Sequence, residues 1–192
     1  MTDGAPPEAP TNRREAILAA ALELFRRRSF HAVGIDEIGT AAGISGPGVY
    51  RHFPSKDSLL VALFDRISEQ MLTGARAVAA ENLSPEETLR RLVELHVGYA
   101  AGERALLSVW IQDWRSLPAP DRHRVRRRQV EYMSEWIRAL TEIRPDLSPK
   151  AVDTVAYAAV NTINSVAFRD ANLPREQLDP LLARLALAVL SA

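Results

Sequence analysis

The sequence predicts an all-α protein of about nine helices, and three observations carry this prediction. Apolar residues recur at three- and four-residue spacing along most of the 192 residues, which is the period of a helix with one buried face. Serine followed by proline and acidic residues, as at residues 84–87, is typical of a helix start. No segment alternates apolar and polar residues with the period of two that a strand requires.

Composition excludes several classes of protein. The chain has 24 Lys and Arg against 24 Asp and Glu, so no net charge draws it to nucleic acid and any DNA binding needs a local patch. It has no cysteine, which excludes disulfides and thiolate metal sites. The acidic, proline-rich start is unlike a signal peptide, and no apolar run is long enough to span a bilayer. We therefore expect a cytoplasmic protein without membrane contact.

A tail, a first helix and then a short helix are expected at the start of the chain. Residues 1–10 predict a disordered tail, and a helix starting at Arg13 places Ile17 and Phe25 on one apolar face. After a connector, Gly34 is a candidate N-cap for a short helix that Gly43 ends.

A second short helix follows directly. Ser45 is its expected N-cap, and the helix should run through Phe53 and stop near Pro54. Ser55 then caps a long helix that reaches about Ala79. Two short helices joined by a glycine turn and braced on both sides predict a helix-turn-helix domain over residues 11–56.

Residues 57–192 predict a second, larger helical domain. Its later helices are expected at 84–102, at 103–115, from an N-cap at Asp121 to Pro145, from Ser148 to about Asn172, and from Pro174 onward. The helix at 150–170 is apolar on nearly all sides, so it should be buried on more than one face. We expect it to form a homodimer interface together with the last helix, as a four-helix bundle about a two-fold axis.

Residues 13–60 resemble the TetR family of bacterial transcriptional repressors. The stretch AAGISGPGVYRHFPSKDSLL at residues 41–60 carries most of the resemblance, supported by residues 14–25 and 35–38. The resemblance implies a dimeric helix-turn-helix protein that binds operator DNA and carries a small-molecule site in its C-terminal domain.

The resemblance also assigns DNA-binding residues. Arg51 is the one strong base reader among them, because a guanidinium can bind guanine O6 and N7 together. The expected phosphate contacts are Tyr50, His52 and Lys56, and the expected base-facing positions are Ser45, Gly46, Pro47, Gly48 and Arg51.

Two positions depart from the family pattern. Ser29 stands where most members have glycine, so a strained left-handed backbone is expected there. Val33 and Gly34 stand where a threonine or serine usually precedes the first short helix. This removes a likely phosphate contact, which Arg13 or Arg14 would have to replace.

Paired aromatic and polar residues on several helices predict a ligand pocket with an apolar body and a few polar groups. A plain core or a dimer interface is the alternative for each of them. The set is His96, Tyr99, Trp110, Trp114, Tyr132, Trp136, Asn161 and Asn164.

The basic run at residues 122–128 allows two interpretations. Such runs usually form a solvated helix face that pairs with acids elsewhere, and the other interpretation is an anchor for an acidic ligand. The four histidines show no metal-ligand spacing, so neither a metal nor a cofactor is expected.

These features together predict a repressor that a small molecule releases from operator DNA. The effector could be an acyl-CoA, another amphipathic acid or a neutral compound. A TetR-like activator and a helical protein–protein adaptor without DNA binding stay open as alternatives. An enzyme is not expected, because no nucleophile–base pair or phosphate loop is found.

Overall fold

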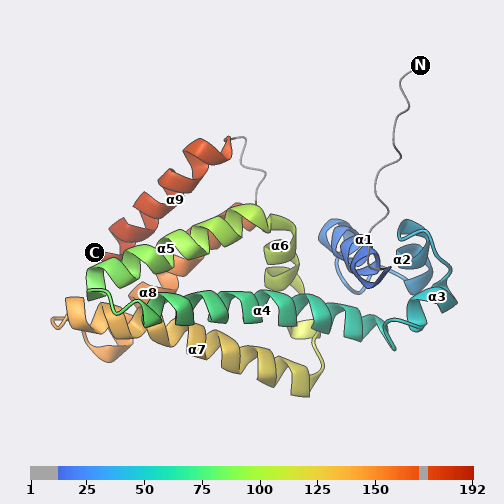
Figure 1. Ribbon diagram of the computed structural model, residues 1–192, viewed down its shortest axis with the longest axis horizontal. Helices are drawn as coiled ribbons and strands as arrows, with labels where there is room; N and C mark the ends of the chain where they lie inside the picture. The colour runs from blue at the N-terminus through green and yellow to red at the C-terminus, as the bar shows by residue number, and fades with distance from the viewer. Residues whose placement is uncertain (1–12, 169–172) are drawn as a thin grey trace.

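A computed structural model describes residues 13–168 and 173–192, and within them the chain forms nine α-helices and no strand (Figure 1). The predicted all-α fold is confirmed. The tail predicted at residues 1–10 lies outside the described residues.

Three helices build the small N-terminal unit: α1 (Arg13–Arg28), α2 (Ile35–Ala41) and α3 (Gly46–Tyr50). They enclose a compact apolar core whose members include Ile17, Phe25, Ile38, Val49 and Phe53. These are the side chains that the three- and four-residue spacing placed inward, and their burial fixes the angle between α2 and α3.

Local chemistry sets the ends of the short helices. Gly34 is the N-cap of α2, and its N–H donates to the Glu37 carboxylate at 2.8 Å. The Ser45 hydroxyl accepts from the Gly48 N–H at the start of α3. The prediction that α3 runs through Phe53 is wrong: it ends at Tyr50 and continues as a turn in which the His52 and Phe53 N–H groups both donate to the Val49 carbonyl oxygen.

One long helix belongs to both units. Helix α4 (Lys56–Ala80) begins beside α3, with Ser55 as its N-cap, and runs through the larger unit. Its 25 residues give a rod of about 38 Å at 1.5 Å per residue. It packs against α1 at one end and against the C-terminal helices over the rest of its length (Figure 1).

Five further helices complete the larger unit: α5 (Pro85–Gly102), α6 (Arg104–Asp113), α7 (Ala119–Ile143), α8 (Pro149–Asn164) and α9 (Arg175–Leu190). Helices α5 and α7 pack on α4, and α8 packs on α9. The short helix α6 stands between α5 and the N-terminal unit, where it contacts α1 (Figure 1).

Three predicted boundaries need correction. Asp121 is not an N-cap: α7 starts two residues earlier, because Pro120 fits the first turn of a helix, where its missing N–H has no partner to lose. The helix expected at 103–115 ends at Asp113 and continues as the 3-10 turn η1 (Trp114–Ser116). Helix α8 ends at Asn164, followed by the 3-10 turn η2 (Ser165–Ala167), and the predicted end at Asn172 lies outside the described residues.

Candidate nucleic-acid interface and ligand cavity

The outer face of α3 is polar, and its inner face packs on the core of the small unit. Val49 is fully buried and holds the helix on the small core, while Ser45, Pro47 and Tyr50 are exposed. Arg51 and His52 follow at the exposed C-terminal end of the helix. Within the described residues, no hydrogen bond or ion pair engages the side chains of Tyr50, Arg51 and His52, so these groups are available to an external partner.

Gly46 and Gly48 do not lie on this surface. Both are buried, which corrects their assignment as base-facing positions. A Cβ on Gly46 would come within 1.8 Å of the Asp36 carboxylate, and a Cβ on Gly48 would touch Ile44. The absence of a side chain at Gly46 therefore lets α3 approach α2 closely, whereas a Cβ on Gly48 would make ordinary van der Waals contacts.

Lys56 also differs from its expected role. Its ammonium donates to the carbonyl oxygens of Phe30 and Val33, both at 3.0 Å, and lies 4.5 Å from the centre of the Phe30 ring. The side chain is directed into the protein, so in this structure Lys56 ties the loop between α1 and α2 to the start of α4.

That loop is constrained from several sides. Ser29 has a φ of +64°, as its departure from the family glycine predicted. Arg28 pairs with Glu37 at 2.6 Å, and the Arg28 hydrogen bond, after the bond from the Gly34 backbone N–H, lowers the Glu37 pKa. The ion pair between Arg28 and Glu37 therefore connects the start of this loop to α2.

Two hydrogen bonds join this loop to the larger unit. The buried carboxylate of Asp113, at the end of α6, accepts from the Phe30 backbone N–H at 3.0 Å. The Ser116 hydroxyl bonds Nε2 of His31 at 2.9 Å. The small domain thus meets the end of α6 directly as well as through α4.

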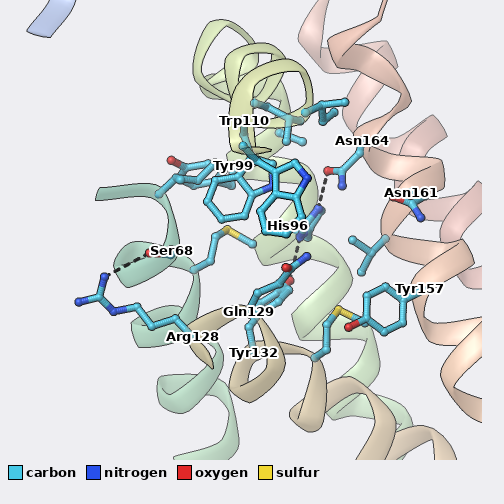
Figure 2. A pocket seen from close by; sticks show the side chains of 18 of the residues that line it. Ser68, His96, Tyr99, Trp110, Arg128, Gln129, Tyr132, Tyr157, Asn161 and Asn164 are labelled. Carbon is cyan, nitrogen blue, oxygen red and sulfur yellow. Dashed lines mark hydrogen bonds between the residues drawn. The ribbon is translucent and has the colours of Figure 1, made fainter. Parts of the chain in front are cut away.

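A cavity of about 280 Å³ lies inside the larger unit, between α4, α5, α6, α7 and α8 (Figure 2). Its walls are mostly apolar and aromatic, with a few polar groups, which is the usual composition of a small-molecule site. Seven of the eight residues predicted for a pocket line it: His96, Tyr99, Trp110, Trp114, Tyr132, Asn161 and Asn164.

Trp136 does not line the cavity. It is fully buried, and its ring meets those of His96 and Tyr132 edge-on, with centroids 6.1 and 6.2 Å apart. It therefore supports two lining side chains from behind.

A chain of hydrogen bonds crosses the cavity wall. His96 lies between Asn164 and Tyr132, with 2.8 Å from Nε2 to the amide oxygen and 2.8 Å from Nδ1 to the hydroxyl (Figure 2). Burial lowers the pKa of His96 to about 4, against the weaker opposing effect of Asn164, so the imidazole is neutral near pH 7. Nε2–H must donate to the amide oxygen, which leaves Nδ1 to accept from the Tyr132 hydroxyl.

Several lining residues were not predicted. Arg126, Gln129 and Tyr157 line the cavity with Ser68 and Arg128. Helical spacing could have found two of them: Arg126 lies three residues before the inward-facing Gln129, and Tyr157 lies one or two turns before the predicted Asn161 and Asn164.

The basic run on α7 divides into two parts. Asp65 accepts from both Arg124 and Arg128 at 2.7 Å, which agrees with a charged face paired to acids. Arg126 and Arg127 make no ion pair within the described residues, and Arg126 lines the cavity. The paired-face interpretation thus applies to Arg124 and Arg128, while Arg126 lines the cavity without an acidic partner among the described residues.

Two other kinds of site are absent from the part of the chain that the structure describes. Across residues 13–168 and 173–192, no three His, Asp or Glu side chains are grouped as metal ligands. No helix in those ranges has both the length and the apolar character needed to cross a bilayer.

Comparison with known families gives two matches along the chain. The family described as bacterial regulatory proteins, tetR family, matches residues 17–63, and the tetracyclin repressor-like C-terminal domain matches residues 82–168. Together the two models cover the helix-turn-helix unit and most of the larger unit.

Individual proteins agree with these matches. The HTH-type transcriptional activator FasR of Mycolicibacterium smegmatis is 39% identical over 82 residues, which are 43% of this chain and 37% of that protein. The match thus spans well under half of the relative's length.

Solved structures share the whole fold. A TetR-family transcriptional regulator from Bordetella parapertussis superposes with a TM-score of 0.83 at 22% identity, covering 93% of this chain and 95% of the other. AibR, solved in complex with isovaleryl coenzyme A and operator DNA, superposes with a TM-score of 0.77 at 18% identity, covering 91% and 97%. At these identities the likeness establishes the fold.

Proposed function

Since the chain belongs to the TetR family of bacterial regulatory proteins, we propose that it is a ligand-responsive repressor. In this proposal it binds operator DNA as a homodimer and leaves the DNA when a small molecule occupies the cavity. The observation that carries the proposal is the exposed, unpaired group of Tyr50, Arg51 and His52 at and just after the end of α3, in a molecule that also encloses a cavity of ligand size.

The proposed DNA contacts divide by chemistry. Tyr50 and His52 reach phosphates, which fix the register of α3 in the major groove. Arg51, with Ser45 and Pro47 beside it, reads base edges. Since the formal net charge is zero, binding depends on this local group and on the fit of two α3 helices to one duplex.

The proposed dimer forms through α8 and α9. Leu185 on α9 is 45% exposed, and Phe168, just after η2, is 69% exposed. Ala158 on α8 is also exposed, so apolar side chains on both helices lack cover in a single chain. Pairing these helices about a two-fold axis would bury them and set the separation of the two α3 helices.

The proposed effector is an amphipathic compound, either an acyl-CoA or another amphipathic acid. The aromatic walls and the polar chain through His96 suit a ligand with an apolar body and a polar end. The structural relative AibR was solved with isovaleryl coenzyme A, which supports this choice of class.

Helix α6 offers a route from the cavity to the DNA. Trp110 and Ile111 line the cavity, while Asp113 on the same helix holds the Phe30 N–H in the small domain. A ligand that displaces Trp110 would move α6 and thereby bias the position of the small domain, with α4 as the second connection. The shift in DNA affinity equals the ligand's differential affinity for the two arrangements.

Selection from a pool of random duplexes tests the proposal. We expect an enriched inverted repeat whose half-sites lie about one helical turn or somewhat more apart, because a two-fold dimer presents two α3 helices. Absence of any enriched motif would contradict the proposal and favour the adaptor.

The proposed mode of action is repression. The proposed location is the cytoplasm, where the chromosome is accessible. FasR, the activator with 39% identity, keeps activation as the second candidate. A reporter driven by the promoter that carries the selected motif separates the two, since deletion of the gene raises expression for a repressor and lowers it for an activator.

A further inference from the structure

The cavity wall carries cationic groups and no acid. Its lining includes Arg126 and Arg128 but neither Asp nor Glu among the described residues. Three other titratable lining groups are neutral near pH 7, because burial lowers the pKa of His96 and raises the pKa of Tyr99 and Tyr132. The local charge is therefore positive.

The two arginines differ in their partners. Arg128 binds Asp65 at 2.7 Å, so its charge is neutralised, and it also donates to the Ser68 hydroxyl at 3.3 Å. Figure 2 shows the bond to Ser68. Arg126 has one hydrogen-bond partner within the described residues, the neutral amide oxygen of Gln129 at 3.3 Å. Since Arg126 is exposed and also lines the cavity, it lies at the rim with no counter-ion.

Two amide side chains on the wall, Gln129 and Asn164, have oxygens that already accept a hydrogen bond. The Gln129 oxygen accepts from Arg126, and the Asn164 oxygen accepts from His96. The remaining groups of both amides are N–H donors. The Ser68 hydroxyl donates to the Asp65 carbonyl and accepts from Arg128, so it has no free proton.

From this arrangement we infer that the effector is a carboxylic acid with an apolar body, its carboxylate bound by Arg126 and the Gln129 amide at the rim. The apolar part lies between Trp110, Trp114 and Met71 in the interior. This inference rests on the proposed function and names the ligand class of the same cavity. A guanidinium with no carboxylate partner is complementary to a carboxylate, because its charge is opposite and its N–H donors can bind both carboxylate oxygens.

The size of the cavity agrees with a free acid. A volume of about 280 Å³ is just below the range of roughly 300–1,000 Å³ for small-molecule sites. A chain of medium length fits that volume, whereas a coenzyme A thioester could place only its acyl part inside.

Direct titration of the purified full-length protein tests the inference. Saturated acids from hexanoate to dodecanoate, each paired with the alcohol of the same chain length, are titrated by calorimetry below their micelle concentrations. For at least one chain length we expect the acid to bind about tenfold more tightly than the alcohol, because a charge-assisted hydrogen bond is lost in the alcohol.

Variants on α7 locate the anchor. Arg126→Ala should remove the preference for the acid, and Arg126→Lys should retain part of it. Arg127→Ala is the matched control, since Arg127 is exposed, adjacent and outside the lining of this cavity; it should bind as the wild type does.

Three results would overturn the inference: equal binding of acid and alcohol, an unchanged preference in Arg126→Ala, or no binding by any acid in the series. The titrations contain no DNA, so they are separate from the test of the proposed function. A protein that selects an operator but binds no acid refutes the ligand class alone, and one that binds the acid but selects no operator refutes the repressor alone.

Discussion

Ser29 is a strained residue, since φ of +64° is a region that serine rarely adopts. Replacing it with glycine removes the steric cost but increases the entropy of the unfolded chain. We expect Ser29→Gly to raise the free energy of unfolding by about 0.5–1 kcal/mol in urea denaturation.

The matched control for this change is Asn82→Gly. Asn82 also has a positive φ, of +51°, but asparagine tolerates this region better than serine does, so the gain should be smaller. A loss of stability in Ser29→Gly, or an equal gain in both variants, would contradict the assignment of strain to Ser29.

His96 makes stability depend on pH. Its pKa in the folded protein is about 4, below its ordinary 6.5, so the unfolded chain binds more protons between these values. The stability that neutral His96 contributes is therefore present above pH 6.5 and falls as the pH drops toward 4. From pH 7.5 to pH 5 we expect a loss of about 2 kcal/mol from this group.

His96→Gln should flatten this part of the pH profile of unfolding, since glutamine does not titrate. His123→Gln is the control, because His123 is exposed on α7 and should leave the profile as it is. Identical slopes in the wild type and in His96→Gln would refute a buried, neutral His96.

Single residues also show what sequence could and could not predict. The strain at Ser29 and the cap at Ser45 follow from local rules, and both are confirmed. The direction of Lys56 depends on where the Phe30 and Val33 carbonyls lie in space, which no local rule supplies. The cation at the rim was predicted only in part: an acidic-ligand anchor was one interpretation of the basic run at residues 122–128, but no local rule singles out Arg126 within that run.

At the level of helices, α6 touches both the cavity and the small domain, as α4 also does. Asp113→Ala would leave the buried Phe30 N–H without an acceptor, at a cost of about 1–3 kcal/mol. We expect faster hydrogen exchange at Phe30 and in the loop up to Gly34 in this variant, measured by mass spectrometry.

Ser116→Ala provides the comparison, because it removes only the exposed bond to His31. It should change exchange in the loop less than Asp113→Ala does. Unchanged exchange in Asp113→Ala would show that α6 does not hold the loop and would remove the proposed route from the cavity.

Helix starts were predictable where serine caps them, as at Ser55, Ser84 and Ser148. The start of α7 was not, because Pro118 and Pro120 resemble a loop in sequence while Pro120 occupies a first turn. The end of α8 was missed for a related reason: Val166 stays buried in the 3-10 turn, so apolar spacing continues past the last α-helical residue.

For the whole molecule, the proposed dimer determines whether two α3 helices can reach one operator. Leu185→Glu places a charge on the exposed apolar part of α9, and burying that charge between two copies would be costly. We expect a dimer dissociation constant raised about tenfold or more in sedimentation equilibrium, with a parallel loss of operator affinity.

Val130→Glu is the control for this prediction. Val130 is 50% exposed but lies on α7, away from the proposed interface. A dimer weakened equally by both changes, or by neither, would contradict an interface through α8 and α9.

Binding of the protein to a duplex from upstream of its own gene tests the central claim most directly. Fluorescence anisotropy at several salt concentrations compares that duplex with a scrambled one, for the wild type and for Arg51→Ala. We predict salt-dependent binding that prefers the upstream duplex and that Arg51→Ala weakens by about 1–3 kcal/mol. Equal affinity for both duplexes, together with no effect of Arg51→Ala on either, would contradict the claim that α3 reads operator DNA.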